Sequence, residues 1–182
     1  MKKIPVKLSV KGLCFLALLT AITVILALFA TIRIGNMIKI PLKFISVFIT
    51  GVFFGPVWAG ISAAIGDLMN SLIMPVGPFM PQIMMVEFLG GFGFGLFMYN
   101  SHENTRFYIL RVIFCALVQF IIDMFLTPVF LVQVGYFPDY SAAIAIRLPA
   151  SLIKAALQIL VMVGGKTYLK VFTKYMRIND EK

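Results

Sequence analysis

The sequence predicts an all-α integral membrane protein, and its composition carries this prediction. Of its 182 residues 61% are hydrophobic and 13% are charged, and its mean hydropathy is +1.01. Soluble domains contain about 45–50% apolar and about 25% charged residues, and a soluble core this small could not bury so large an apolar fraction. A helix of about 20 apolar residues spans a bilayer, so about six spans account for most of the chain.

The first half of the chain contains three predicted helices. Residues 12–32 form an apolar run that is too long for a signal peptide, whose apolar region has about 7–15 residues, so it is predicted as the first membrane helix. A shorter helix is predicted at residues 40–54. Gly55-Pro56 ends it and begins the next helix, at residues 57–74, because proline suits the first turn of a helix.

The second half adds three longer helices. The proline-rich stretch Pro75–Pro81 predicts a loop, and helices follow at residues 82–99, 107–132 and 143–168. Together the six helices form a predicted single membrane domain that covers residues 1–182.

The charge distribution predicts the orientation. Lysine and arginine number 16 against 7 acidic residues, giving a net charge of +9. In a soluble protein such an excess indicates nucleic acid as a partner, but in a polytopic protein basic residues mark the cytoplasmic ends of helices. Most of them lie on the side of the two termini in a six-span topology. We therefore expect cytoplasmic termini, a multi-pass protein of the plasma membrane in contact with lipid, and no nucleic-acid partner.

No motif for catalysis is present. Gly164-Gly165-Lys166 lacks the first glycine and the hydroxyl of a nucleotide-binding phosphate loop, so the chain cannot hydrolyse ATP by itself. Cys14 and Cys115 lie in or beside apolar runs and are interpreted as small core residues, not as a metal or redox pair. We expect no enzymatic activity, no cofactor and no metal.

Four charged residues lie inside the predicted helices: Asp67, Glu87, Asp123 and Lys154. Charges within a membrane are costly and usually functional, and all four fall in the outer half of the bilayer. The alternative for any one of them is structural, for instance an ion pair of Lys154 with Asp67 or Asp123. The one-sided distribution favours a binding site for the cluster as a whole.

Other polar residues extend this cluster. Asn70 follows Asp67 by one turn, Gln119 and Asp123 share a face, and the spacing of the polar residues after residue 146 gives the last helix one polar stripe. Arg33 lies near the predicted mouth. The candidate substrate-binding residues are Arg33, Asp67, Asn70, Phe79, Asp123, Arg147, Lys154 and Gln158.

Small residues one turn apart predict close helix packing. The pairs are Ala17 with Ala21, Gly51 with Gly55 and Gly91 with Gly95. Such pairs usually pack inside a bundle, and a lipid-facing pair indicates a partner helix.

Ordered segments along nearly the whole chain carry a resemblance. They are Arg33-Ile34-Gly35, the run from Gly51 through Phe54-Gly55-Pro56-Val57-Trp58-Ala59-Gly60 to Asp67, Pro75-Val76-Gly77-Pro78-Phe79-x-Pro81, Gly90 with Gly95-Leu96-Phe97-x-Tyr99, and Arg147-Leu148-Pro149-x3-Ile153-Lys154. This set resembles the folate family of substrate-binding S components of energy-coupling factor (ECF) vitamin transporters.

The resemblance implies a six-helix membrane protein that binds a water-soluble vitamin from outside. It implies as partners a transmembrane coupling subunit and two ATP-binding subunits, and it matches Ala17 and Ala21 to the docking face. The chain departs from the folate pattern in having no arginine in the stretch 26–31 and no asparagine in the stretch 125–128.

The chemistry of the candidate residues suits folate or a related pterin or pyrimidine compound. Arg33, Arg147 and Lys154 suit a carboxylate, Asp67 could accept N–H donors of a pterin ring, and Phe79 could cover the ring. A carboxylate alone would describe pantothenate. The other classes are a stand-alone proton- or sodium-coupled transporter and a non-transporting scaffold protein.

Overall fold

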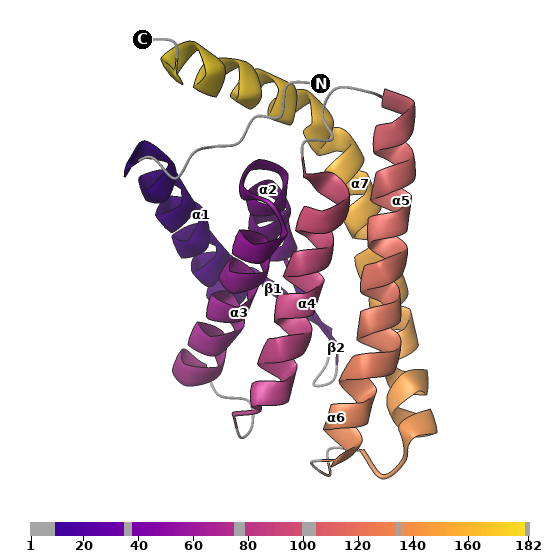
Figure 1. Cartoon of the computed structure of the whole chain (residues 1–182). Coiled ribbons are helices and arrows are strands. Elements are labelled where there is room, and N and C mark those ends of the chain that lie inside the picture. The colour runs from indigo at the N-terminus through magenta and orange to yellow at the C-terminus, as the bar shows by residue number, and fades with distance from the viewer. Residues whose placement is uncertain are drawn as a thin grey trace.

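The structure, a computed structural model, describes residues 10–34, 38–74, 79–99, 105–133, 135 and 137–180. It is an upright bundle of helices in which α1 begins and α7 ends at the same end (Figure 1). The elements are α1 (Val10–Phe29), β1 (Thr31–Ile34), β2 (Ile38–Pro41), α2 (Phe44–Phe54), α3 (Pro56–Ile73), α4 (Pro81–Met98), α5 (Thr105–Ile121), the π-helical segment η1 (Ile122–Leu126), α6 (Thr127–Gln133) and α7 (Tyr140–Asp180).

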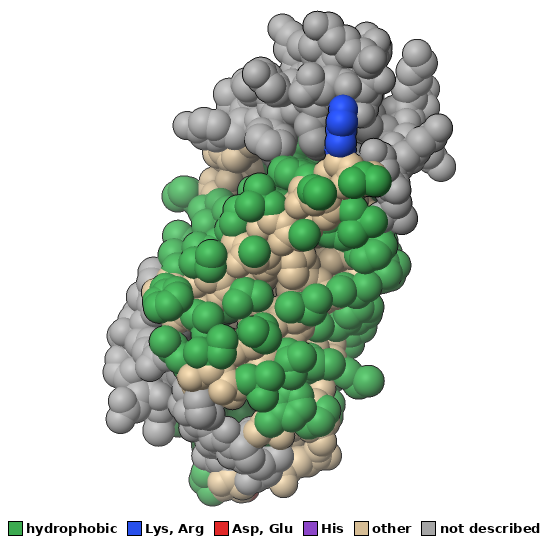
Figure 2. Space-filling view, turned by 90° about the vertical axis from the view of Figure 1, so that its left-hand side faces the viewer, with side chains coloured by type: hydrophobic (Ala, Val, Ile, Leu, Met, Phe, Trp, Pro, Cys, Tyr) green, Lys and Arg blue, Asp and Glu red, His purple; other side chains and the backbone are tan. Residues whose placement is uncertain are grey.

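Among the described residues, four helical stretches are long and apolar enough to cross a membrane. They are Val10–Phe29, Pro81–Met98, Phe107–Gln133 and Tyr140–Lys166. Hydrophobic side chains cover most of the coloured part of the face seen in Figure 2. An apolar surface of this extent is solvated by lipid and not by water, so the chain is a multi-pass membrane protein.

Two of the six predicted helices, α2 and α3, are shorter or less apolar than these four stretches. Helix α2 has 11 residues, about 16 Å at 1.5 Å per residue, against a hydrocarbon core of about 30 Å. Helix α3 carries Asp67 and is not among the four apolar stretches. The predicted bounds of α3 and α4 are nevertheless within one residue of the observed ones.

A β-hairpin corrects the all-α prediction at residues 31–41. The first helix was expected to continue to residue 32 and the second to begin at residue 40, but β1 pairs with β2 as an antiparallel ribbon with Ile32 opposite Ile40. β-Branched residues at alternate positions favour strands. The helix predicted at residues 107–132 is divided by η1, and the one predicted at residues 143–168 is longer, from Tyr140 to Asp180.

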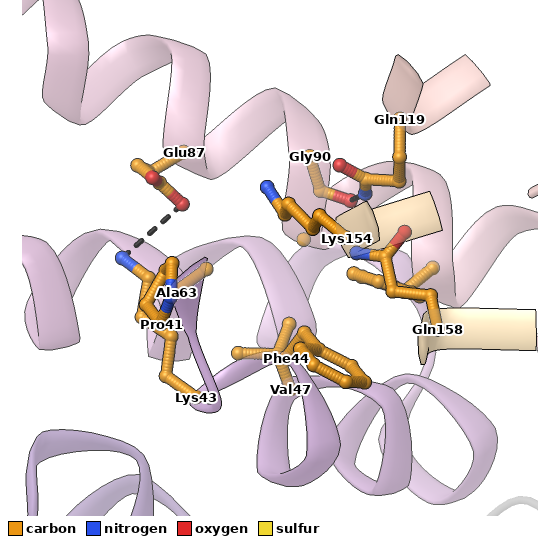
Figure 3. A pocket seen from close by; sticks show the side chains of 12 residues that line it. Pro41, Lys43, Phe44, Val47, Ala63, Glu87, Gly90, Gln119, Lys154 and Gln158 are labelled. Carbon is orange, nitrogen blue, oxygen red and sulfur yellow. Dashed lines mark hydrogen bonds and ion pairs between the residues drawn. The ribbon is translucent and has the colours of Figure 1, made fainter. Parts of the chain in front are cut away.

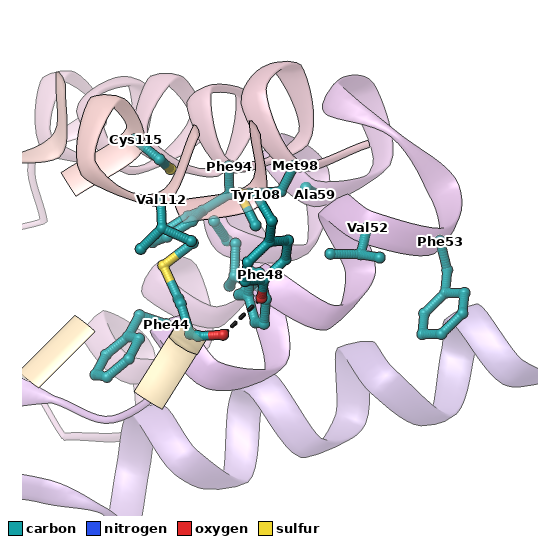
Figure 4. Packing of buried hydrophobic residues seen from close by; sticks show 13 residues of the cluster. Phe44, Phe48, Val52, Phe53, Ala59, Phe94, Met98, Tyr108, Val112 and Cys115 are labelled. Carbon is teal, nitrogen blue, oxygen red and sulfur yellow. Dashed lines mark hydrogen bonds between the residues drawn. The ribbon is translucent and has the colours of Figure 1, made fainter. Parts of the chain in front are cut away.

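The hydrophobic core joins α2 to α4 and α5. Phe44, Phe48 and Val52 of α2 contact a cluster that continues into α4 and α5 (Figure 4). Tyr108 Oη donates a hydrogen bond of 2.5 Å to the Met162 carbonyl, which ties α5 to α7. Cys115 is buried as predicted, whereas Cys14 is exposed on α1, so its interpretation as a core residue is wrong.

Glycines let α2, α3 and α4 approach closely, as their spacing predicts. A Cβ at Gly91 would lie 2.5 Å from the Ala59 carbonyl oxygen, and one at Gly51 would lie 2.9 Å from the Gly95 nitrogen. Gly55, with a φ of 88°, makes the sharp turn between α2 and α3, and a Cβ at Gly95 would lie 2.2 Å from the Pro56 Cα. Backbone therefore packs directly on backbone where these helices meet.

A substitution at this contact tests the packing. We expect Gly95→Ala to lower the stability of the detergent-solubilised protein by about 1–3 kcal/mol, because the added methyl group has no space. Thermal unfolding followed by intrinsic fluorescence measures the change. Gly164→Ala is the matched control, since no atom lies within 4 Å of the added Cβ. Equal midpoints for the two variants would contradict the proposed backbone contact.

Candidate functional site

Lys43 is the centre of a buried charge cluster at the end of the bundle away from the start of α1. It precedes α2, directly after the hairpin, and its side chain is only 7% exposed. Its Nζ lies 3.1 Å from Oε2 of Glu87 on α4 and 3.8 Å from Oδ1 of Asp67 on α3. One ammonium group therefore holds two carboxylates from two helices, and we call these three residues the acidic side of the site.

A second ion pair faces this cluster from α7 and η1. Lys154 Nζ lies 2.5 Å from Oδ2 of Asp123, and both side chains are 17% exposed. Arg147 is half-buried on the same stripe of α7 and lies within electrostatic range of Asp123 and Glu87. We call Asp123, Arg147 and Lys154 the basic side of the site.

The π-helical turn η1 places Asp123. The Thr127 backbone N–H bonds to the Ile122 carbonyl five residues earlier, and the next residue, Pro128, has no N–H to continue an α-helical pattern. Widened turns of this kind often occur at functional sites. The Ser151 hydroxyl, 3.2 Å from Met124 Sδ, holds α7 against this turn.

A small cavity lies between Lys43 and Glu87 of the acidic side and Lys154 of the basic side. Figure 3 shows Lys43 and Glu87 joined on one side of it, with Lys154, Gln119 and Gln158 opposite. Gln119 is buried and donates a 2.5 Å hydrogen bond from Nε2 to the Gly90 carbonyl. The remaining lining residues are Pro41, Phe44, Val47, Ala63, Gly91 and Phe94.

The acidic and basic sides have opposite formal charge. Of their six residues, Lys43, Glu87 and Lys154 line the cavity, and Asp67, Asp123 and Arg147 do not. Two carboxylates and one ammonium give the acidic side a charge of −1, and two cations and one carboxylate give the basic side a charge of +1. Charges in a low-dielectric interior need partners, and the six groups balance as a set. The cavity thus suits a molecule with N–H donors at one end and a carboxylate at the other.

Several predicted site residues meet at this cavity. Lys154 and Gln158 line it, Asp123 pairs with Lys154, and Asp67 belongs to the acidic side. The ion pair of Lys154 with Asp123, named as the structural alternative for this residue, is present. Among the described residues, no three of the types His, Cys, Asp and Glu come together as they would around a metal ion.

Three other predicted residues are not placed at the cavity. Asn70 is half-buried one turn after Asp67, and Phe79 precedes α4 with 45% of its surface exposed; neither lines the cavity. Arg33 lies in β1, where its backbone pairs with Lys39, and its side chain is outside the described part of the chain.

Lys43, Glu87 and Gln119 are missing from the predicted set of site residues. Glu87 and Gln119 were recognised as polar positions within helices but were not assigned to the site. Lys43 was not singled out, because it lies in the first turn of the helix predicted at residues 40–54, where a lysine usually marks the end of a helix at the membrane surface. The hairpin and the late start of α2 bring it inside instead.

Comparison with known proteins agrees with this architecture. The "Folate transporter FolT" of Clostridium novyi is 29% identical over 104 residues, which is 57% of this chain and 60% of that protein. The protein of the same name from Streptococcus mutans is 32% identical over 133 residues, 71% of each chain. A solved structure, "Crystal structure of FolT bound with folic acid", superposes with a TM-score of 0.75 at 26% identity and covers 88% of this chain and 97% of that one.

A family model covers most of the chain. The model, described as "ECF-type riboflavin transporter, S component", matches residues 7–170, from before α1 into the last turns of α7. This is a transporter family and not an enzyme family, and its S components work with an ECF module. The extent of this match, together with the relative from S. mutans, shows that the chain belongs to the S components of ECF-type transporters.

Proposed function

We propose that this chain binds folate at the outer side of the plasma membrane and delivers it to an ATP-driven ECF importer. The observation that carries the proposal is the opposite charge of the two sides of the cavity. Folate has an aminopyrimidinone ring rich in N–H donors at one end and a glutamate with two carboxylates at the other. The names of the two relatives and of the solved structure support the same ligand.

The acidic side favours a pterin over a flavin. Position 2 of the pterin ring carries an amino group, whereas the corresponding position of riboflavin carries a carbonyl oxygen. A carboxylate such as Glu87 accepts hydrogen bonds from the former and repels the latter. Riboflavin also has no carboxylate for Arg147 and Lys154.

The other candidate functions use less of the site. Pantothenate has a carboxylate for the basic side but no aminopyrimidine ring for the acidic side, and a pyrimidine precursor has the ring without the carboxylate. A stand-alone proton- or sodium-coupled transporter would need carboxylates that are free to bind the ion, but Asp67, Glu87 and Asp123 are each paired with a lysine.

The same proposal includes the topology. We place six crossings in the membrane by counting α2 and α3, with both termini in the cytoplasm and the cavity in the outer half of a single membrane domain. The partners are a transmembrane coupling subunit and two ATP-binding subunits, because the chain has no phosphate loop of its own. Ala17 and Ala21 are both exposed on α1, which supports their assignment as the docking face.

Two substitutions test the division of the site into two sides. We expect Arg147→Ala to weaken folic acid binding by about 2–5 kcal/mol, because a ligand carboxylate loses its partner, with little effect on 6-hydroxymethylpterin, which has no carboxylate. Glu87→Gln should weaken the binding of both compounds. Isothermal titration of the purified protein gives the dissociation constants.

The exposed Asp139 supplies the control for these titrations, since Asp139→Asn removes a carboxylate outside the cavity. If Arg147→Ala and Glu87→Gln both bind folic acid as wild type does, the ligand does not lie between these two sides.

Bulky substitutions on α1 test the docking face. Ala17→Trp or Ala21→Trp should abolish folate uptake by the assembled transporter, because close helix approach in lipid depends on small residues. Folic acid binding by the isolated protein should stay normal, since neither alanine lines the cavity. Leu160→Trp on α7 is the control, because Leu160 is also lipid-facing, with 70% exposure. Normal uptake by either alanine variant would show that another surface docks the partner.

A further inference from the structure

Gln158 is a buried polar residue on the wall of the cavity. It follows Lys154 by one turn on α7 and is 1% exposed. Its Nε2 has no hydrogen-bond partner among the described residues. Buried amide N–H groups are nearly always paired in native proteins, so an unpaired one that lines a cavity indicates a ligand.

Gln119 provides an internal comparison. Both glutamines line the same cavity and both are buried. Gln119 uses its Nε2 to bind the Gly90 carbonyl and so joins α5 to α4. Gln158 makes no such bond, and Figure 3 shows its amide nitrogen turned toward the other lining residues. One amide therefore serves the packing of the helices, and the other offers a donor to the cavity.

We propose that Gln158 determines ligand specificity by donating a hydrogen bond from Nε2 to a ring carbonyl of the ligand. The N–H donors next to this carbonyl on the ligand ring bind the acidic side. This inference rests on the proposed function and assigns the part of the ligand that is recognised. The ligand class is a 2-amino-4-oxo-pyrimidine ring fused as in a pterin.

The hydrogen-bonding groups along the edge of this ring complement those of the lining residues. Its 2-amino group and N3–H are donors, and its 4-oxo group is an acceptor. The Glu87 carboxylate offers acceptors and Gln158 offers a donor, and both line the same cavity. A 2,4-diamino ring has an amino group in place of the 4-oxo group, so two donors would then face each other and the Gln158 N–H would remain unpaired.

Folic acid and aminopterin are the probes, because they differ only in this 4-oxo or 4-amino group and in the adjacent N3, which is an N–H donor in folic acid and an acceptor in aminopterin. Wild-type protein should prefer folic acid by about 10- to 100-fold, since a site built to hydrogen-bond a group rejects the analogue that lacks it. Gln158→Leu should lower the ratio of the two dissociation constants by about 10-fold, and the preference that remains comes from the N3–H donor facing the acidic side. Gln158→Glu, which presents only acceptors when ionised, should reverse the preference.

Gln133→Leu is the matched control and should keep the wild-type ratio, because Gln133 is exposed at the end of α6 and does not line the cavity. Thermal unfolding without ligand gives a second readout that separates a binding role from a structural one. Gln158→Leu should melt at or above the wild-type temperature, because it removes an unpaired buried amide, whereas Gln119→Leu should melt lower, because it breaks the bond to Gly90.

The outcomes distinguish a failure of the role proposed for Gln158 from a failure of the proposed folate binding. If the wild-type protein binds folic acid and the folded Gln158 variants keep its full preference over aminopterin, the role of Gln158 is wrong and the folate proposal stands. A large loss of thermal stability in Gln158→Leu would also overturn the role, because it would show a structural bond. If the wild-type protein binds neither compound, the proposed function fails and Gln158 has no pterin to recognise.

Discussion

The pairing of Lys43 with Asp67 and Glu87 is the constraint on which the site depends. An isolated charge is costly in a medium that cannot solvate it, and removal of one partner from a buried pair leaves that cost uncompensated. Lys43 therefore holds α3 and α4 at the positions where both carboxylates reach one ammonium group. Because one cation faces two anions, the acidic side keeps a negative charge, which the basic side balances across the cavity.

Close backbone packing makes this pairing possible. Gly91 and Gly95 allow α4 to lie against α3 and the turn at Gly55-Pro56, so that Asp67 and Glu87 come from adjacent helices. A side chain at either glycine would move α4 away from α3. The missing side chain at Gly90 likewise admits the Gln119 amide to the carbonyl it binds. The glycines of α4 thus set the geometry of the site as well as the packing of the bundle.

The sequence predicted the parts of this structure that depend on local pattern. Apolar runs located the helices, and the isolated charges Asp67, Glu87, Asp123 and Lys154 marked the site, because both signals are read within a single segment. The position of Lys43 could not be predicted in this way. It depends on a hairpin of two four-residue strands and on a helix that begins only at Phe44, and its partners follow 24 and 44 positions later in the chain.

The cavity and the proposed docking face are connected through buried hydroxyl groups. Ser46 Oγ on α2 donates a 2.8 Å hydrogen bond to the Leu19 carbonyl on α1, and Thr23 Oγ1 lies 3.1 Å from Ser62 Oγ on α3. A Cβ at Gly66 would touch both Thr23 and the Lys43 stem, so α1 and Lys43 meet at one point of α3. A displacement of Lys43 would therefore be transmitted to α1, the helix that carries Ala17 and Ala21. Coupling of this kind needs only a dense contact, and no moving domain is required to transmit it.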